Sequence, residues 1–129
     1  MFVALFNSYG QKVAVGKYSS KVPSDTLYCA ALAAIPGIQF IVKTTDNQHG
    51  IIQAEQWSFG VDKQIFASIF ILIKQEDGKN VIQATVTRCT GFLVGEKPIK
   101  MALQLADYIK KIIPDLKISA TDSKSEIIY

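Results

Sequence analysis

The sequence predicts an α+β fold, in which an antiparallel sheet of four or more strands carries two helices packed on one face. Four consecutive segments between residues 38 and 88 have strand character, and a segment of helical character lies on either side of them. Asp77 and Gly78 join the last two strands, and this dipeptide is one of the strongest local signals for a β-hairpin. Two helices that flank an antiparallel meander bury their apolar faces most economically on one side of its sheet.

The first helix is expected over residues 24–35, with the sequence SDTLYCAALAAI. Ser24 is suited to cap its N-terminus, and Asp25 in the first turn is favourably placed for the helix dipole. Pro36 and Gly37 then end the helix. One face carries small side chains that allow close approach to a sheet, namely Leu27, Ala30, Ala31 and Ala34.

The strand segments are apolar runs separated by residues that favour turns. They are IQFIVKT (38–44), IIQAEQW (51–57), IFASIFILIKQ (65–75) and NVIQATVTR (80–88). The first two are joined by residues 45–50, where Asp46 and Gly50 favour a hairpin loop. The third strand is apolar on both faces, because Phe70 and Leu72 on one face alternate with isoleucine and alanine on the other.

The second helix is expected over residues 98–113 and is amphipathic. Apolar residues recur at spacings of three and four, whereas lysine, glutamine and aspartate fill the opposite face. Met101 and Tyr108 lie in the apolar stripe, which is more typical of a core than of a cofactor site. Lys110 and Lys111 fall in the last turn, where positive charge favours the helix dipole, so we do not interpret them as a phosphate site.

The whole chain, residues 1–129, is expected to form a single domain. Its composition of 49% hydrophobic and 10% aromatic residues suffices for one core at this length. Residues 2–6 and 12–18 flank a turn-like segment and are expected to form an N-terminal strand pair within residues 1–20. Residues 114–129 begin with a proline and are mostly polar, which predicts a short strand or a loose tail.

Charge and composition argue against a nucleic-acid partner. Fourteen lysines and arginines against eleven acidic residues give a net charge of +3, without a long block of like charges. Arg88 is the single arginine, and arginine is the side chain best suited to bidentate contact with phosphates and guanine edges. No membrane span is expected either, because no run approaches the roughly twenty apolar residues that a span needs. The N-terminal segment also lacks the length and flanking charge of a signal peptide.

The residue types that bind metals or act in catalysis form no recognisable site. Cys29 and Cys89 lie sixty positions apart and, with a single histidine in the chain, give no zinc-ligand spacing. Two free thiols are expected, at least one of them buried. His49 follows Asp46 by three residues, and we interpret it as part of a turn and not as a general base. The sequence therefore predicts no catalytic residue, no metal site and no cofactor.

The order of the elements resembles that of a known family. A helix, Pro36-Gly37, a strand, a turn with Asp46 and the run GIIQA (50–54) are followed by two strands and an amphipathic helix. This order is similar to that of the small α+β modules of bacterial envelope lipoproteins, including BamC-like domains, and it covers roughly residues 24–113. The resemblance implies a non-catalytic accessory or interaction domain at the cell envelope. If the protein is not related to that family, a cytoplasmic location is expected.

The two apolar faces of the third strand raise the question of what covers the side away from the helices. The alternatives are the N-terminal strand pair, a second copy of the protein, and an apolar ligand or partner. The leading hypothesis is a non-enzymatic interaction module that binds a protein partner or forms a homodimer through a sheet face or edge. The alternative is a carrier of a small apolar ligand, or a small enzyme, with a pocket between sheet and helices. Trp57, Phe70 and Tyr108 are the residues expected at such a surface or pocket.

Overall fold

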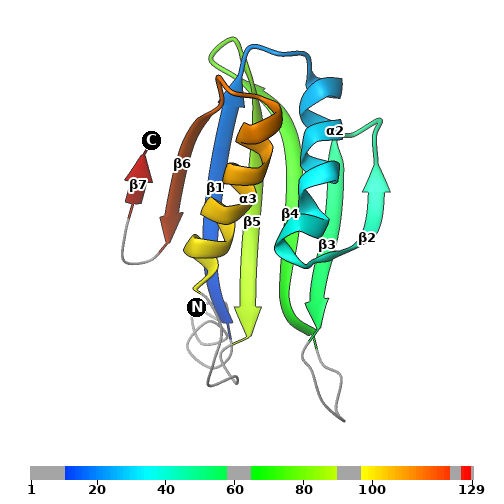
Figure 1. Ribbon diagram of the computed structural model, residues 1–129, viewed down its shortest axis with the longest axis vertical. Coiled ribbons are helices and arrows are strands. Elements are labelled where there is room, and N and C mark those ends of the chain that lie inside the picture. Colours follow the sequence, from blue (N-terminus) through cyan, green and yellow to red (C-terminus); the bar gives the residue numbers. More distant parts are fainter. Residues whose placement is uncertain (1–10, 58–64, 90–96, 123–125, 129) are drawn as a thin grey trace, which may run out of the picture.

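The computed structural model describes residues 11–57, 65–89, 97–122 and 126–128. These residues form strands, two α-helices and a 3-10 helix (Figure 1). The elements in chain order are β1 (Gln11–Ser20), α2 (Ser24–Ala34), η1 (Ile35–Ile38), β2 (Ile41–Asp46), β3 (Ile51–Trp57), β4 (Ile65–Glu76), β5 (Lys79–Cys89), α3 (Pro98–Ile112), β6 (Lys117–Asp122) and β7 (Glu126–Ile128).

All of these strands belong to one seven-stranded sheet in the order β2-β3-β4-β5-β1-β6-β7. Every neighbouring pair is antiparallel, so the predicted α+β class is confirmed. β1 comes first in sequence but lies between β5 and β6. The sequence pattern suggests that residues 12–18 pair with residues 2–6, whereas the structure pairs them with β5 and β6. Residues 2–6 lie outside the described residues.

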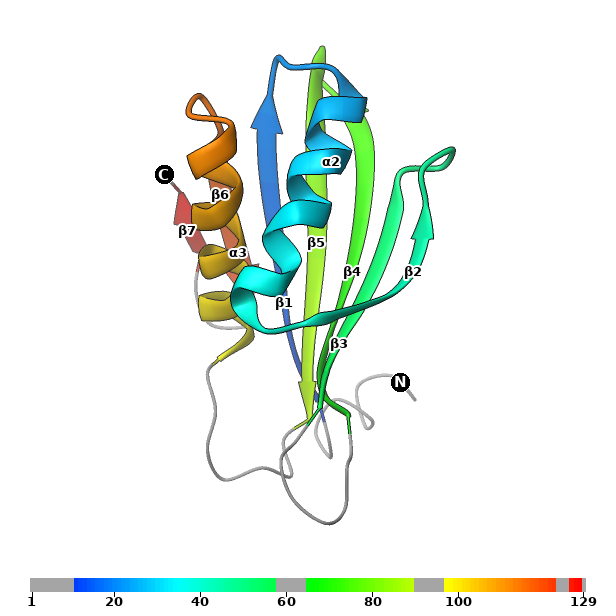
Figure 2. The same cartoon turned by 45° about the vertical axis from the view of Figure 1, so that its right-hand side comes forward.

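Both helices lie on the same face of the sheet, as predicted (Figure 2). α3 packs over β1, β5 and β6, whereas α2 packs over β4 and β5. After η1 the chain crosses in front of the sheet to reach β2 at its edge (Figure 2). The two helices therefore cover one face of the sheet, and the opposite face is not covered by either helix.

The start of α2 differs from the prediction in the residue that caps it. Pro23 and not Ser24 occupies the capping position, and no side chain makes a capping hydrogen bond there. The carbonyl oxygen of Pro23 accepts hydrogen bonds from the backbone N–H groups of Thr26 and Leu27, at 3.0 and 3.2 Å. The expectation for Ser24 is wrong because the extended backbone of Pro23 already provides the entry to the helix, with φ −57° and ψ 152°.

The end of α2 also differs in detail. The helix stops at Ala34, and Pro36 and Gly37 belong to the 3-10 helix η1 that continues from it. Gln39 then adopts the left-handed conformation, with φ 66°, and its N–H donates a hydrogen bond to the carbonyl of Pro36. This tighter turn uses residues that the sequence pattern places in a strand, so β2 begins at Ile41 and not at residue 38.

The hydrophobic core fills the space between the helices and the sheet. Its largest fully buried side chains are Tyr18, Leu27, Ile35, Ile52, Ile69, Ile71, Ile82, Val86, Leu105 and Ile109. The small-residue face predicted for α2 is buried as well, since Leu27, Ala30, Ala31 and Ala34 are all nearly inaccessible. The hydroxyl of Tyr18 donates a hydrogen bond to the backbone carbonyl of Ala102, which joins β1 to α3 through the core.

Two hairpin turns depend on glycine. Asp77 and Gly78 have positive φ values of 52° and 76°, so the β4–β5 hairpin closes with the two-residue turn that Asp-Gly predicts. Gly50, with φ 66°, ends the turn between β2 and β3. Its carbonyl oxygen accepts a hydrogen bond from the backbone N–H of Ile73 at 2.8 Å, so this turn lies against β4.

Replacing Gly50 with alanine is expected to destabilise the protein more than replacing Gly78 with alanine. Both positions have left-handed φ values, which cost an L residue about 1 kcal/mol. A Cβ at Gly50 would also lie 3.0 Å from the carbonyl oxygen of Ile73, whereas a Cβ at Gly78 meets no atom within 4 Å. We expect the free energy of unfolding to fall by about 2 kcal/mol for Gly50→Ala and about 1 kcal/mol for Gly78→Ala in urea titrations. Equal losses would contradict this account.

Candidate functional site

The face of the sheet turned away from the helices carries apolar side chains that neither helix covers. We call it the open face and define it by its apolar members on β1, β3 and β4. They are Val13, Val15, Ile51, Trp57, Ile65, Phe70 and Leu72. Side chains alternate along each strand, so the residues between them, such as Ala14, Ile52 and Ile71, point into the core.

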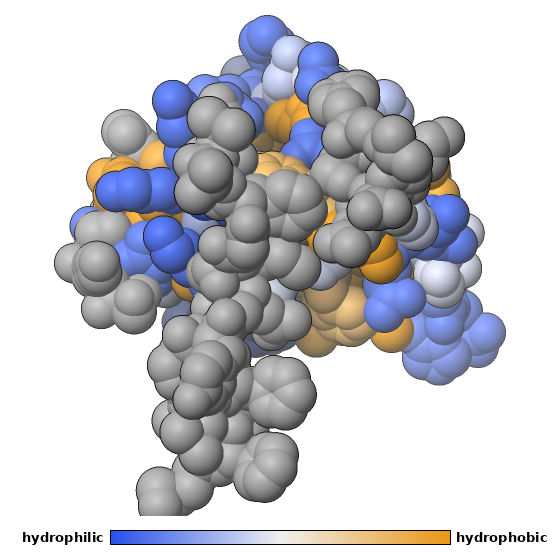
Figure 3. All heavy atoms as spheres, turned by 90° about the horizontal axis from the view of Figure 1, so that it is seen from below, coloured by the Kyte–Doolittle hydropathy of each residue, from blue (hydrophilic) through white to orange (hydrophobic). Residues whose placement is uncertain are grey.

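Phe70 lies at the centre of the open face. The register places it opposite Gln53 on β3 and Thr85 on β5, and Thr85 in turn lies opposite Val15 on β1. Phe70 is 39% exposed although β4 is an inner strand of the sheet. Trp57 is 37% exposed and marks one end of the face, where it pairs with Ile65. Seen from that end of the molecule, hydrophobic surface is exposed in several patches among hydrophilic residues (Figure 3).

The residues paired with Phe70 across the strands form a row on the open face, namely Gln53, Phe70, Thr85 and Val15. Charged side chains lie on the rows beside it and not within it. On one side Glu55 is half-buried and lies 4.0 Å from the ammonium of Lys43. On the other side Lys17 donates hydrogen bonds to both carboxylate oxygens of Glu76, at 3.2 and 3.3 Å. An uncharged centre with ion-paired margins is the arrangement typical of protein interfaces.

The ion pairs at the β4–β5 hairpin keep the carboxylate of Glu76 ionised. Lys74 lies 3.1 Å from Oε2 of Glu76, and Lys17 contacts the same carboxylate. Hydrogen bonds from Lys74 and then Lys17 hold the pKa of Glu76 below its usual range. Lys17, Lys74 and Glu76 are therefore charged at neutral pH and lie at the end of the open face beside the β4–β5 hairpin.

His49 belongs to the turn between β2 and β3, which agrees with its interpretation from sequence. Its backbone N–H donates a hydrogen bond to Oδ1 of Asp46 at 3.2 Å, and its Nδ1 lies 2.8 Å from Oδ2. The hydrogen bond from the His49 ring, followed by that from the His49 backbone, lowers the pKa of the Asp46 carboxyl. Both side chains are exposed to a substantial degree, and their bonds close the turn.

The structure does not bring the three residues expected at a surface or pocket together. Trp57 and Phe70 lie on the open face, whereas Tyr108 lies on α3 at the opposite side of the sheet. A pocket between sheet and helices that includes Trp57 or Phe70 is therefore not formed. The reason is the strand alternation, which turns Gln56 (beside Trp57) and Ile69 (beside Phe70) toward the helices.

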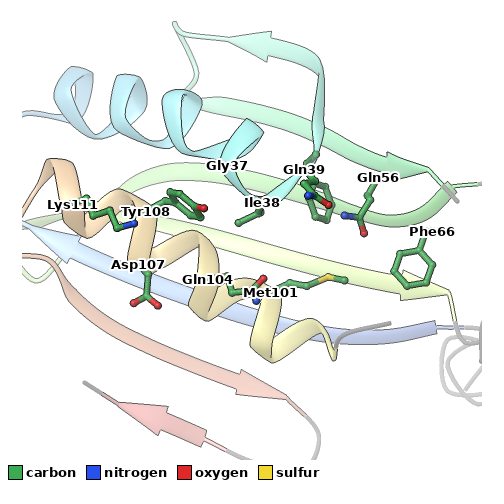
Figure 4. Close-up of a pocket in the computed structure, with 11 residues that line it drawn as sticks. Gly37, Ile38, Gln39, Gln56, Phe66, Met101, Gln104, Asp107, Tyr108 and Lys111 are labelled. Atoms are coloured by element: carbon green, nitrogen blue, oxygen red, sulfur yellow. The ribbon is translucent and has the colours of Figure 1, made fainter. Parts of the chain in front are cut away.

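Tyr108 instead lines a groove on the helix side, between η1 and α3, with a volume of about 580 Å³ (Figure 4). Gln39, Gln56 and Gln104 also line it, and the sequence pattern contains no signal that would single them out. Phe66 lines the groove because a register shift in the β3–β4 ladder turns it to the helix side. Such a shift cannot be seen in the alternation of apolar residues.

Cys29 and Arg88 contribute nothing to the open face. Cys29 is a free thiol exposed on α2, and the side chain of Cys89 lies outside the described residues. The expected burial of one thiol therefore stays a prediction for Cys89. Arg88 is only 6% exposed, and its guanidinium lies 5.1 Å from the centre of the Phe66 ring.

No protein-family model matches the chain, and no curated protein matches it either. Neither helix in the described part of the chain is long and apolar enough to cross a membrane. Across the same residues, histidine, cysteine, aspartate and glutamate form no group of three or more that could hold a metal ion.

Proposed function

We propose that this protein is a non-enzymatic interaction module that pairs with a second copy of itself through the open face. The observation that supports the proposal most directly is the exposure of Phe70 at the centre of an inner strand, on the face that the helices leave uncovered. Large aromatic side chains at the centre of a surface are the residues that most often anchor protein interfaces.

The side of the sheet that carries the open face is large enough for a dimer interface. The six strands from β2 to β6 in the sheet order are separated by five intervals and span roughly 24 Å at their usual spacing, and seven residues along a strand span roughly 24 Å. Each partner would contribute roughly 600 Å², so a pair of sheets would bury roughly 1,200 Å². That area lies at the lower end of the range of specific protein interfaces.

The charge distribution also favours a second copy as the partner. Two sheets that pack face to face around a two-fold axis bring the same central row together. That row runs through Val15, Thr85, Phe70 and Gln53 and carries no charge, so pairing buries no like charges at the centre. Glu55 and Lys17 on the adjacent rows each have an oppositely charged neighbour in the same chain.

The replacement Phe70→Glu tests this proposal. We expect the wild-type protein to sediment as a dimer and the variant as a monomer, because a carboxylate at the centre of the interface would be buried without a partner. The matched control is Ile112→Glu, which changes an even more exposed apolar residue, 52% accessible, on the helix side. This control should stay dimeric. A wild-type monomer at all concentrations tested, or a Phe70→Glu dimer, would refute the proposal.

We also propose an accessory role at the cell envelope, on the resemblance to BamC-like modules. The order of α2, the Pro36-Gly37 turn, the β2–β5 meander and α3 supports that comparison. The alternative of a carrier for a small apolar ligand is less well supported, since the groove beside Tyr108 has three carboxamides among its lining residues.

A further inference from the structure

The groove between η1 and α3 is elongated and has two distinct walls. One wall is a face of α3 that runs from Met101 through Gln104 to Lys111. At 1.5 Å per residue this wall is about 15 Å long. The other wall consists of Gly37 and Gln39, and it continues into the end of the sheet at Gln56 and Phe66 (Figure 4).

Three carboxamides line the groove from both sides. Gln39 and Gln56 lie on the wall formed by η1 and the sheet, and Gln104 projects from α3 across from them (Figure 4). None of the three side chains makes a hydrogen bond to any residue that the structure describes. Gln56 and Gln104 are half-buried and Gln39 is exposed, and each carboxamide offers both hydrogen-bond donors and an acceptor.

The floor between these walls is apolar. Ile38 and Phe40 are buried beneath the groove, Met101 is buried at the base of the α3 wall, and Phe66 is half-buried at the end of the groove. Methionine adapts its shape readily, which allows different apolar groups to rest against it. A floor of this kind favours an apolar side chain, whereas the walls favour groups that both donate and accept hydrogen bonds.

An extended peptide has both properties. Its backbone presents N–H and C=O groups along both edges, so carboxamides on two facing walls can pair with it from either side. Alternate side chains of an extended peptide point toward the same surface, which places them on the apolar floor. A groove of about 15 Å accommodates four or five residues at about 3.3 Å per residue.

We propose that the groove binds an extended peptide segment of four or five residues, held through its backbone by Gln39, Gln56 and Gln104. At least one large apolar side chain of the peptide rests against Phe66, the half-buried apolar residue at the end of the groove. This site lies on the opposite side of the sheet from Phe70 and does not depend on the function proposed for the open face.

The test is a selection from a phage-displayed library of random seven-residue peptides against the wild-type protein. Enriched sequences are then synthesised with blocked termini, and their affinity is measured by fluorescence polarisation. We expect enrichment of peptides with a large apolar residue, and a loss of affinity of roughly tenfold or more in the double variant Gln56→Ala/Gln104→Ala. We expect this variant to fold, because both side chains are only half-buried and line the groove. Thermal unfolding checks that it does.

The matched control is Phe70→Glu, which alters the open face and should leave peptide affinity unchanged within about twofold. A second variant, Gly37→Ala, should weaken binding, because its Cβ would lie 2.8 Å from the Tyr108 ring and displace it. The proposal is overturned if no peptide is enriched, or if the double variant binds the selected peptides as well as the wild type does. It is also overturned if Phe70→Glu abolishes binding while the groove variants retain it.

Discussion

Replacing Tyr18 with alanine is expected to lower the free energy of unfolding by about 3–5 kcal/mol. Tyr18 is completely buried on β1, where its ring belongs to the core between the sheet and α3. Truncation leaves a large cavity and removes the hydrogen bond that its hydroxyl donates to the carbonyl of Ala102. Urea unfolding monitored by circular dichroism measures the loss. The control Tyr108→Ala removes the same side chain at a half-exposed position and should cost far less.

The variant Tyr18→Phe separates the hydrogen bond from the packing and should cost about 1–2 kcal/mol. It also makes a prediction for pH. Burial raises the pKa of the Tyr18 hydroxyl above its usual range, so the folded protein favours the neutral form. That contribution is present in full below about pH 10 and is lost as the pH rises further, when tyrosine ionises in the unfolded chain. The stability difference between wild type and Tyr18→Phe should therefore shrink above about pH 10. A constant difference would contradict this role.

The elements of this fold can be predicted because each depends on neighbouring residues. Apolar spacing defines α3, the Asp77-Gly78 pair defines the β4–β5 turn, and alternation defines the extents of β3 and β4 closely. The position of β1 between β5 and β6 depends on pairings between distant residues. No local pattern specifies such pairings, which explains why residues 12–18 suggest a different partner.

The candidate sites were predictable to a smaller degree. The sequence shows that β4 has two apolar faces, and Phe70 follows directly from that pattern. The separation of Phe70 from Tyr108 depends on which face of β4 meets the helices, and only the three-dimensional arrangement decides this. The groove depends on η1 and on the register shift beside Phe66, which both arise from backbone geometry. Its glutamines have no periodicity that would connect them.

Ile71 and Phe70 are neighbours on β4, but we expect Ile71→Ala to weaken folding and Phe70→Ala to weaken self-association. Ile71 is completely buried against the helices, so its truncation should lower the free energy of unfolding by about 2–4 kcal/mol at every protein concentration. Phe70 points to the open face, where its truncation should weaken the pairing of two copies. Thermal unfolding at several protein concentrations distinguishes these effects.

A protein that unfolds from a dimer gains thermal stability as its concentration rises, because the equilibrium then favours the associated state. The midpoint temperatures of unfolding of the wild type and of Ile71→Ala should therefore both rise with protein concentration. The midpoint of Ile71→Ala should stay below that of the wild type at every concentration. The midpoint of Phe70→Ala should change little over the same range, since weaker pairing removes the contribution of the partner. If all three midpoints were independent of concentration, the open face would not be a self-association surface. The lower stability of Ile71→Ala would then still report the packing of β4 against the helices.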